Sequence, residues 1–121
     1  MRKLSVMALL ILLYSCKSTK PELKLSNYTY DFGNVKKDSI YQGKAIIKNI
    51  GNDTLIIQQI SPDCSCTNVY ATKKQILPND TCFIKFSYKT FHKIRKQENF
   101  ISIIANTDSV VHLLQINAFV K

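Results

Sequence analysis

Apolar and polar residues alternate with a period of two in several short segments, and this pattern constrains the fold more than any other feature. From Thr81 to Tyr88, every second residue is apolar: Cys82, Ile84, Phe86 and Tyr88. Because successive side chains of a strand point to opposite faces, this alternation is typical of a half-buried β-strand. After residue 15, no segment sustains the helical period of about 3.6 residues. We therefore expect an all-β fold.

The remaining apolar segments have the same character, and turn residues separate them. The other expected strands are 28–32, 40–48, 54–60, 100–105 and 110–120, with a short edge strand at 69–71. Gly33-Asn34 closes the first as a turn, and a bulge near Gln58-Gln59 would return Ile60 to the interior. Segment 90–99 is polar and basic, and we expect a loop there. The economical architecture is an immunoglobulin-like antiparallel β-sandwich of about seven strands, with a small barrel as the alternative.

The first residues have the layout of an export signal. The basic segment Met1–Lys3 precedes an apolar stretch, residues 4–14, that is too short to span a bilayer. Ser15 and Cys16 follow, as at the cleavage site of a bacterial lipoprotein; an ordinary secretory signal with a chance cysteine is the alternative. We expect a cleaved signal peptide at 1–15, a lipidated N-terminus and tether at 16–22, and the sandwich domain at 23–121.

Lipidation of Cys16 would place the protein on a membrane of the bacterial cell envelope. Diacylglycerol on the thiol and an acyl group such as palmitate on the new amine together give stable anchoring. Lys17 stands where an aspartate marks some lipoproteins for retention in the inner membrane. Its presence favours the outer membrane.

The positive charge invites the hypothesis of a nucleic-acid partner. The net charge is +9, from 17 basic and 8 acidic residues, and loss of Arg2 and Lys3 with the signal would lower it to +7. Basic residues are scattered apart from segment 92–96, and no tract interleaves aromatic and basic residues as a single-strand binder would. We expect no nucleic-acid partner, and instead an envelope protein or glycan.

Three cysteines remain if Cys16 carries lipid: Cys64, Cys66 and Cys82. One disulfide would leave one thiol over, and three intramolecular pairings are open. A Cys64–Cys66 bond would close a very small ring and be more easily reduced. A bond to Cys82 would tie two strands together. All three residues could instead be small, buried and unpaired.

Closely spaced thiolates also suit Cu(I) or zinc, so a metal or redox role of Cys64 and Cys66 is the alternative function. A closed zinc site needs four ligands, and neither His92 nor His112 has ligand spacing to the cysteines. We therefore expect no cofactor. No base, phosphate-binding loop or pair of carboxylates stands at a recognisable spacing either, so we expect that the chain is not an enzyme.

A binding role would use loops and edge strands, because those are the parts of a sandwich that recruit partners. The cysteine loop follows Pro62, which cannot donate to a ladder and should end the pairing there. Segment 90–99 is the second candidate. The candidate contact residues in these two loops are Asp63, Ser65, Thr67, His92, Lys93, Arg95 and Lys96.

Several short motifs follow one another in a recognisable order: Tyr30-Asp31-Phe32-Gly33, Asn49-Ile50-Gly51, Cys64-Ser65-Cys66-Thr67, Leu77-Pro78 and Ala105-Asn106. The ordered set resembles a bacterial envelope family known as domain of unknown function 1573, over about residues 28–120. The resemblance implies an immunoglobulin-like fold and an envelope or secreted protein, often a lipoprotein, with no established activity.

The chain departs from that family in two places. Ser65 stands where the family has Gly between the cysteines, and Asn79 where it has Gly after proline. Asn tolerates a positive φ better than other non-glycine residues, so the turn at Asn79 can survive. If position 65 requires a positive φ, the cysteine loop is strained or takes another shape.

Overall fold

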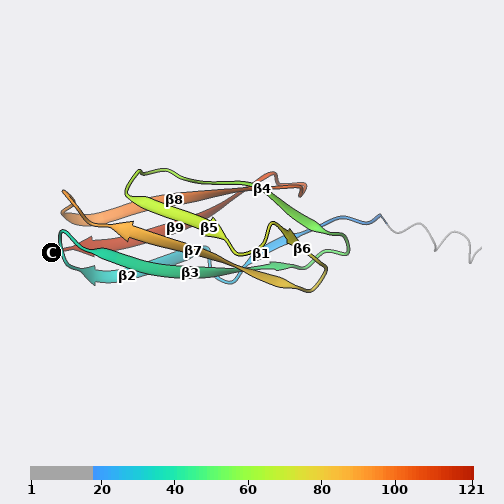
Figure 1. Ribbon diagram of the computed structural model, residues 1–121, viewed down its shortest axis with the longest axis horizontal. Helices are drawn as coiled ribbons and strands as arrows, with labels where there is room; N and C mark the ends of the chain where they lie inside the picture. The colour runs from blue at the N-terminus through green and yellow to red at the C-terminus, as the bar shows by residue number, and fades with distance from the viewer. Residues whose placement is uncertain (1–17) are drawn as a thin grey trace, which may run out of the picture.

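The protein forms an elongated two-layer β-sandwich (Figure 1). The computed structural model describes residues 18–121, and the expected signal peptide and lipidated Cys16 lie outside this range. Within it, nine strands and no α-helix are present: β1 (Leu23–Leu25), β2 (Thr29–Val35), β3 (Ile40–Asn49), β4 (Leu55–Pro62), β5 (Thr67–Ala71), β6 (Gln75–Ile76), β7 (Thr81–Lys89), β8 (Arg95–Ala105) and β9 (Val111–Val120). Across residues 18–121 there is no helix long and apolar enough to cross a membrane.

The strands form a four-stranded sheet, in the order β1-β3-β7-β5, and a five-stranded sheet, in the order β2-β9-β8-β4-β6. Seven pairs of neighbouring strands make up the two sheets, and within the described chain only the pair β2–β9 is parallel. The all-β, immunoglobulin-like sandwich is therefore confirmed. The strand number exceeds the expected seven because β1 and β6, of 3 and 2 residues, are too short to show a period.

The core lies between the sheets and follows the alternation of the sequence. In β7, Cys82, Ile84, Phe86 and Tyr88 are all buried, as predicted. Leu114, Ile116, Ala118 and Val120 of β9 line the opposite side. An aromatic cluster fills one part of this core, where the Phe32 ring stacks on Tyr88 with a centroid distance of 5.8 Å. Burial of these faces supplies most of the favourable free energy of folding.

The structure confirms the predicted irregularities of β4. The register between β4 and β8 shifts between Ile57 and Gln59, so a bulge accommodates the extra residue at Gln58. The strand ends at Pro62, after which the chain enters the cysteine loop. This places Cys64 and Cys66 between two strands of different sheets, since β4 belongs to one sheet and β5 to the other.

Two predictions of local structure were wrong. Gly33-Asn34 does not end the first strand, because β2 absorbs these residues at a register shift between Asp31 and Asn34 and continues to Val35. Segment 90–99 is a loop only up to Ile94, since β8 begins at Arg95 and pairs along its length with β9. Both stretches are polar and bury little apolar surface. They therefore show no apolar alternation, although their backbone groups form hydrogen bonds within the sheet.

Residues just before β1 also contact the sandwich. Lys20 and Asn52 exchange two hydrogen bonds, and the Ile50 amide donates to the Glu22 carbonyl at 2.9 Å. Gly51 permits this contact, because a Cβ there would lie 2.3 Å from the Lys20 carbonyl oxygen. We call this part of the molecule, residues 20–22, 49–54, 72–80 and 106–109, the entry end; it lies opposite the labelled C-terminus (Figure 1).

Candidate functional site

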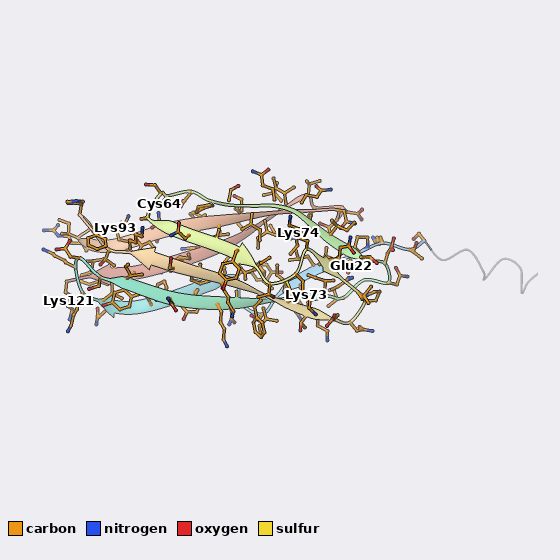
Figure 2. The ribbon with its side chains drawn as sticks, in the orientation of Figure 1. Glu22, Cys64, Lys73, Lys74, Lys93 and Lys121 are labelled. Carbon is orange, nitrogen blue, oxygen red and sulfur yellow. A yellow bond between two sulfur atoms is a disulfide. The ribbon has the colours of Figure 1, made fainter. Side chains whose placement is uncertain are left out.

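The structure brings the two predicted loops together, toward the end of the sandwich opposite the entry end. Cys64 and Lys93 are neighbours in Figure 2, with Lys121 beyond them. The Lys89 amide donates to the Cys66 carbonyl at 2.8 Å, and Lys93 Nζ lies 5.5 Å from the centroid of the Tyr88 ring. We call this region, residues 36–39, 63–66, 89–95 and 121, the distal end.

A disulfide joins Cys64 and Cys66 in the loop between β4 and β5. The loop is compact, because the Thr67 amide donates to the Cys64 carbonyl and the Asp63 amide to the Phe100 carbonyl, at 3.1 and 2.9 Å. Of the three pairings that the sequence left open, this is the one present. In this form the two sulfurs are not thiolates, and residues 18–121 contain no cluster of three metal-ligating side chains.

Cys82 is free and buried, and burial raises the pKa of its thiol. It opposes Ile47 near the start of β7, whereas Thr67, next to Cys66, opposes Tyr88 near the end of that strand. Six residues of strand separate the two positions, a span of about 20 Å. A bond between Cys82 and either loop cysteine is therefore incompatible with this fold.

The departures from the family pattern have different outcomes. Asn79 has a φ of 65°, so it takes the left-handed conformation that the family's glycine would allow, as predicted. Ser65 is absent from the residues with positive φ, so the cysteine loop takes a shape that serine adopts without this strain. Ser65 is exposed between two half-buried cysteines, at the tip of the loop.

A polar chain runs from the core to the cysteine loop. The buried Tyr88 hydroxyl donates to Asn99 Oδ1 at 2.9 Å, and Asn99 Nδ2 donates to Asp63 Oδ1 at 3.3 Å. Burial, and then the negative charge of Asp63, raise the pKa of Tyr88, so its hydroxyl stays a donor. Sequence reasoning missed Asn99, because it lies in the polar segment whose strand had no apolar period.

A buried threonine holds the basic turn that precedes β8. Thr90 Oγ1 donates to the Lys36 carbonyl at 2.7 Å and accepts from the Ser39 amide at 2.9 Å. His92 and Arg95 have φ values of 62° and 63°, a conformation that costs a bulky residue about 1 kcal/mol or more. This turn is therefore held in shape by the loop beside it, residues 36–39.

Not all of the predicted contact residues lie on an accessible surface. Thr67 is only 3% exposed, so it belongs to the wall of the sandwich and not to a contact surface. Lys96 lies on β8 and forms an exposed ion pair with Glu98 at 3.1 Å. Asp63, Ser65, His92 and Arg95 are exposed, and Lys93 is half-buried against Tyr88. The accessible candidates thus concentrate in 63–66 and 92–96.

The distal end carries an unbalanced positive charge. It contains six cationic side chains, Lys36, Lys37, Lys89, Lys93, Arg95 and Lys121, against Asp38 and Asp63, a net of +4. Its two carboxylates form no ion pair with a described residue. At the entry end, Lys20 pairs with Asp108 and Lys73 with Asp80, at 3.1 and 3.2 Å.

Neither histidine forms a hydrogen bond with a cysteine in the described chain. His112 Nε2 lies 2.8 Å from Thr107 Oγ1 in the turn before β9, and burial lowers the pKa of its imidazole. His92 is exposed in the basic turn. What this site offers chemically is an exposed disulfide loop, an acidic side chain tied to a buried tyrosine, and a group of cations.

Two sheets packed face to face in this order define a small immunoglobulin-like sandwich domain. The chain belongs to the DUF1573 family, "Protein of unknown function (DUF1573)", whose model matches residues 23–120. Among curated proteins, none matches the chain. The family assignment agrees with the resemblance of the ordered motifs, and it assigns no activity.

Three solved structures illustrate how widely this fold occurs. A protein of unknown function from Porphyromonas gingivalis W83 is similar with a TM-score of 0.74 and 14% identity, over 88% of this chain and 50% of that one. This chain thus spans half the length of that protein. The ASH/PapD-like domain 7 of human CEP192 (TM-score 0.64, 8% identity) is matched over 88% of this chain and 89% of that domain. The Vibrio cholerae VesB protease (0.64, 10%) is matched over 82% and 31%. At these identities the likeness concerns the fold alone.

Proposed function

We propose that this protein is a membrane-anchored envelope lipoprotein whose sandwich domain is a non-enzymatic binding module, and that it presents its distal end to an envelope protein or glycan. One observation supports this most: the chain enters the sandwich at one end, and the accessible candidate residues gather toward the other (Figure 2). A lipid on Cys16 would hold the entry end near the membrane. The distal end would then face away from it, toward a partner.

The physical character of the distal end suits recognition. Loops held by a rigid scaffold are common binding surfaces. Here the scaffold consists of the hydrogen bonds that Thr90 makes to the loop 36–39 and of those that join Tyr88, Asn99 and Asp63. The exposed groups are Ser65 and the cations of the basic turn. Unpaired cations attract and orient an acidic partner. Because Lys17 stands where an aspartate would mark retention in the inner membrane, the proposed location is the outer membrane.

The Cys64–Cys66 disulfide supports a second candidate function, which is thiol–disulfide exchange with a partner protein. The bond joins residues only two apart in sequence and lies in a loop at the surface. A thiolate of the partner would attack one sulfur, form a mixed disulfide and release the other sulfur as a thiolate. Metal binding would require the reduced form of this loop.

Two experiments test the proposal. Intact mass of the full chain, recovered from membranes of a bacterium that processes lipoproteins, is expected to show loss of residues 1–15 and addition of acyl chains. The Cys16→Ser variant is expected to keep its mass unmodified and to leave the membrane fraction. Membrane association that persists in Cys16→Ser would overturn the lipid anchor.

The binding module is tested by photo-cross-linking in living cells. A photoreactive residue at Ser65 or Ile94 is expected to give a discrete adduct, and one at Thr107, at the entry end, is not. Charge reversal at Lys93 and Arg95 is expected to reduce the Ser65 adduct. If Cys64→Ser and Cys66→Ser remove the adduct while both reversals leave it unchanged, thiol exchange replaces the binding module as the function.

A further inference from the structure

The outer face of the four-stranded sheet carries two parallel rows of side chains that the distal end does not include. Strands β3, β7 and β5 lie side by side in this sheet (Figure 1). Gln42 and Asn68 both oppose Ser87, which makes one row across the three strands. Lys44 and Tyr70 both oppose Lys85, which makes the next row. A neutral row of amides and a hydroxyl therefore adjoins a row of two cations and an aromatic ring.

These rows line a shallow cavity of about 540 Å³. Gly43 of β3 and Phe86 of β7 form part of its floor, and the Tyr30 ring lies behind them. The rows are about 7 Å apart, and three strands span about 10 Å, which is comparable with one pyranose unit and its substituents. The cavity therefore has room for a sugar residue laid on the sheet.

The hydrogen-bonding groups of this cavity are free for a ligand. Within residues 18–121, the side chains of Gln42, Asn68 and Ser87 make no hydrogen bond, and Lys44 and Lys85 form no ion pair. Lys44 Nζ lies 5.2 Å from the Phe83 ring centroid, so its ammonium group stays on this face. Tyr70 is 58% exposed, although aromatic rings are favourable when covered.

The charge on this face is of one sign. The four strands β1, β3, β5 and β7 contain no aspartate or glutamate. Lys44 directly opposes Lys85, an arrangement that repels and that costs stability in the unliganded protein. Such a pair is favourable when an anion lies between the two ammonium groups.

We propose that this cavity binds an acidic sugar unit of a polysaccharide. The carboxylate of the sugar lies between Lys44 and Lys85, its ring covers Tyr70, and its hydroxyls bond to Gln42, Ser87 and Asn68. A nucleic acid would need several aromatic platforms along the groove, and these two rows provide one. This inference adds a ligand class to the proposed binding module and uses residues outside the distal end.

The test is a calorimetric titration of the full chain, purified from membranes in detergent, with a short oligogalacturonate. Saturable binding is expected, and the double variant Lys44→Gln/Lys85→Gln is expected to weaken it by roughly tenfold or more. The matched control is Lys24→Gln/Lys48→Gln, which removes an equally charged, directly opposed pair from the same face outside the cavity. This control is expected to change binding less than about twofold. Tyr70→Ala is expected to weaken binding as well, with no change in charge.

Both double variants remain folded on physical grounds, because each removes a repulsion between exposed side chains. If the two double variants weaken binding equally, the electrostatic attraction is diffuse and the proposed site is wrong. If the methyl-esterified oligosaccharide binds as tightly as the acid, the role of the lysines is wrong. Equal or tighter binding of oligothymidylate, or of phosphatidylglycerol vesicles, overturns the sugar as the ligand. All of these readouts leave the Ser65 cross-linking test untouched, so either proposal can fail alone.

Discussion

The two ends of the sandwich are held in different ways. At the entry end, the buried side chain of Asn49 donates to the Asp53 and Ile76 carbonyls and accepts from the Gly51 amide. Asn106 plays a similar part by bonding to both the Ile56 amide and the Thr54 carbonyl. At the distal end, a disulfide, three residues with positive φ (Asp38, His92 and Arg95) and a half-exposed polar chain serve instead.

The difference indicates a division of labour. The entry end pairs two of its three lysines with carboxylates and holds its loops with asparagine side chains, which makes for stability. The distal end leaves cations unpaired and holds His92 and Arg95 in unfavourable conformations, and such features concentrate where proteins bind partners. Asn49, Gly51 and Asn106 belong to the family-like motifs of the sequence, and all three now have a structural reason at the entry end.

The largest effect should come from Asn49→Ala. This substitution removes three short hydrogen bonds and leaves buried backbone groups without partners, so we expect a loss of about 3 kcal/mol in the free energy of unfolding. The matched variant in the polar chain that leads to the distal end, Asn99→Ala, should lose about 1 kcal/mol, because this side chain makes two hydrogen bonds and one of them is exposed. Urea unfolding measures both, and equal losses would remove the contrast between the ends.

Gly51→Ala should have the next largest effect. The new Cβ would collide with the backbone at Lys20 and Glu22, so residues 20–22 must detach, at a cost of about 2 kcal/mol. Hydrogen exchange at the Ile50 and Asn52 amides should accelerate in this variant, because their acceptors lie in residues 20–22. In Gly33→Ala, the added carbon meets open space and only the positive φ is unfavourable, so about 1 kcal/mol is expected.

Loss of the Cys64–Cys66 disulfide should matter less than either change at the entry end. The bond closes a loop so short that chain entropy predicts a stabilisation of about 1.5 kcal/mol. Unfolding of the wild type with and without reductant measures it, and the Cys64→Ser/Cys66→Ser variant should be insensitive to reductant. A loss as large as that of Asn49→Ala would mean that the distal end carries the stability of the domain.

The smallest effect should be a pH dependence from His112. Burial lowers the pKa of its imidazole below the usual 6.5, so the unfolded chain binds a proton more readily than the folded one. The stability that this group contributes is therefore present above pH 6.5 and is lost as the pH falls from there toward the folded pKa. Comparing unfolding free energies at pH values on both sides of this window, in wild type and His112→Gln, should show that the variant lacks this part of the decline.

Most of the sandwich could be predicted from local pattern. The alternation in β7 and β9 persists because both strands have one face in the core, and the Gln58 bulge was visible because Ile60 breaks the period of β4. The first residues of β8 gave no such signal. Their inward positions, Gln97 and Asn99, are polar because this part of β8 extends to the margin of the core.

Long-range pairing and the site were less accessible. The parallel pairing of β2 with β9 depends on strands far apart in sequence, and no local pattern specifies it. The sequence could suggest two loops, but only the fold places Asp63 beside Asn99 and Lys93 over Tyr88. The rows on the outer sheet face were invisible for the same reason, since Gln42 and Asn68 come together only through the register with Ser87.

The position of β9 has a consequence for biosynthesis. This strand is the last of the nine to be made, yet it lies between β2 and β8 inside the five-stranded sheet. Until it leaves the ribosome, β2 has no partner in that sheet and the core lacks Leu114 and Ile116. The domain therefore cannot complete its fold until β9 has been made. Such late folding keeps a chain open to passage through a secretion channel, which the proposed envelope location requires.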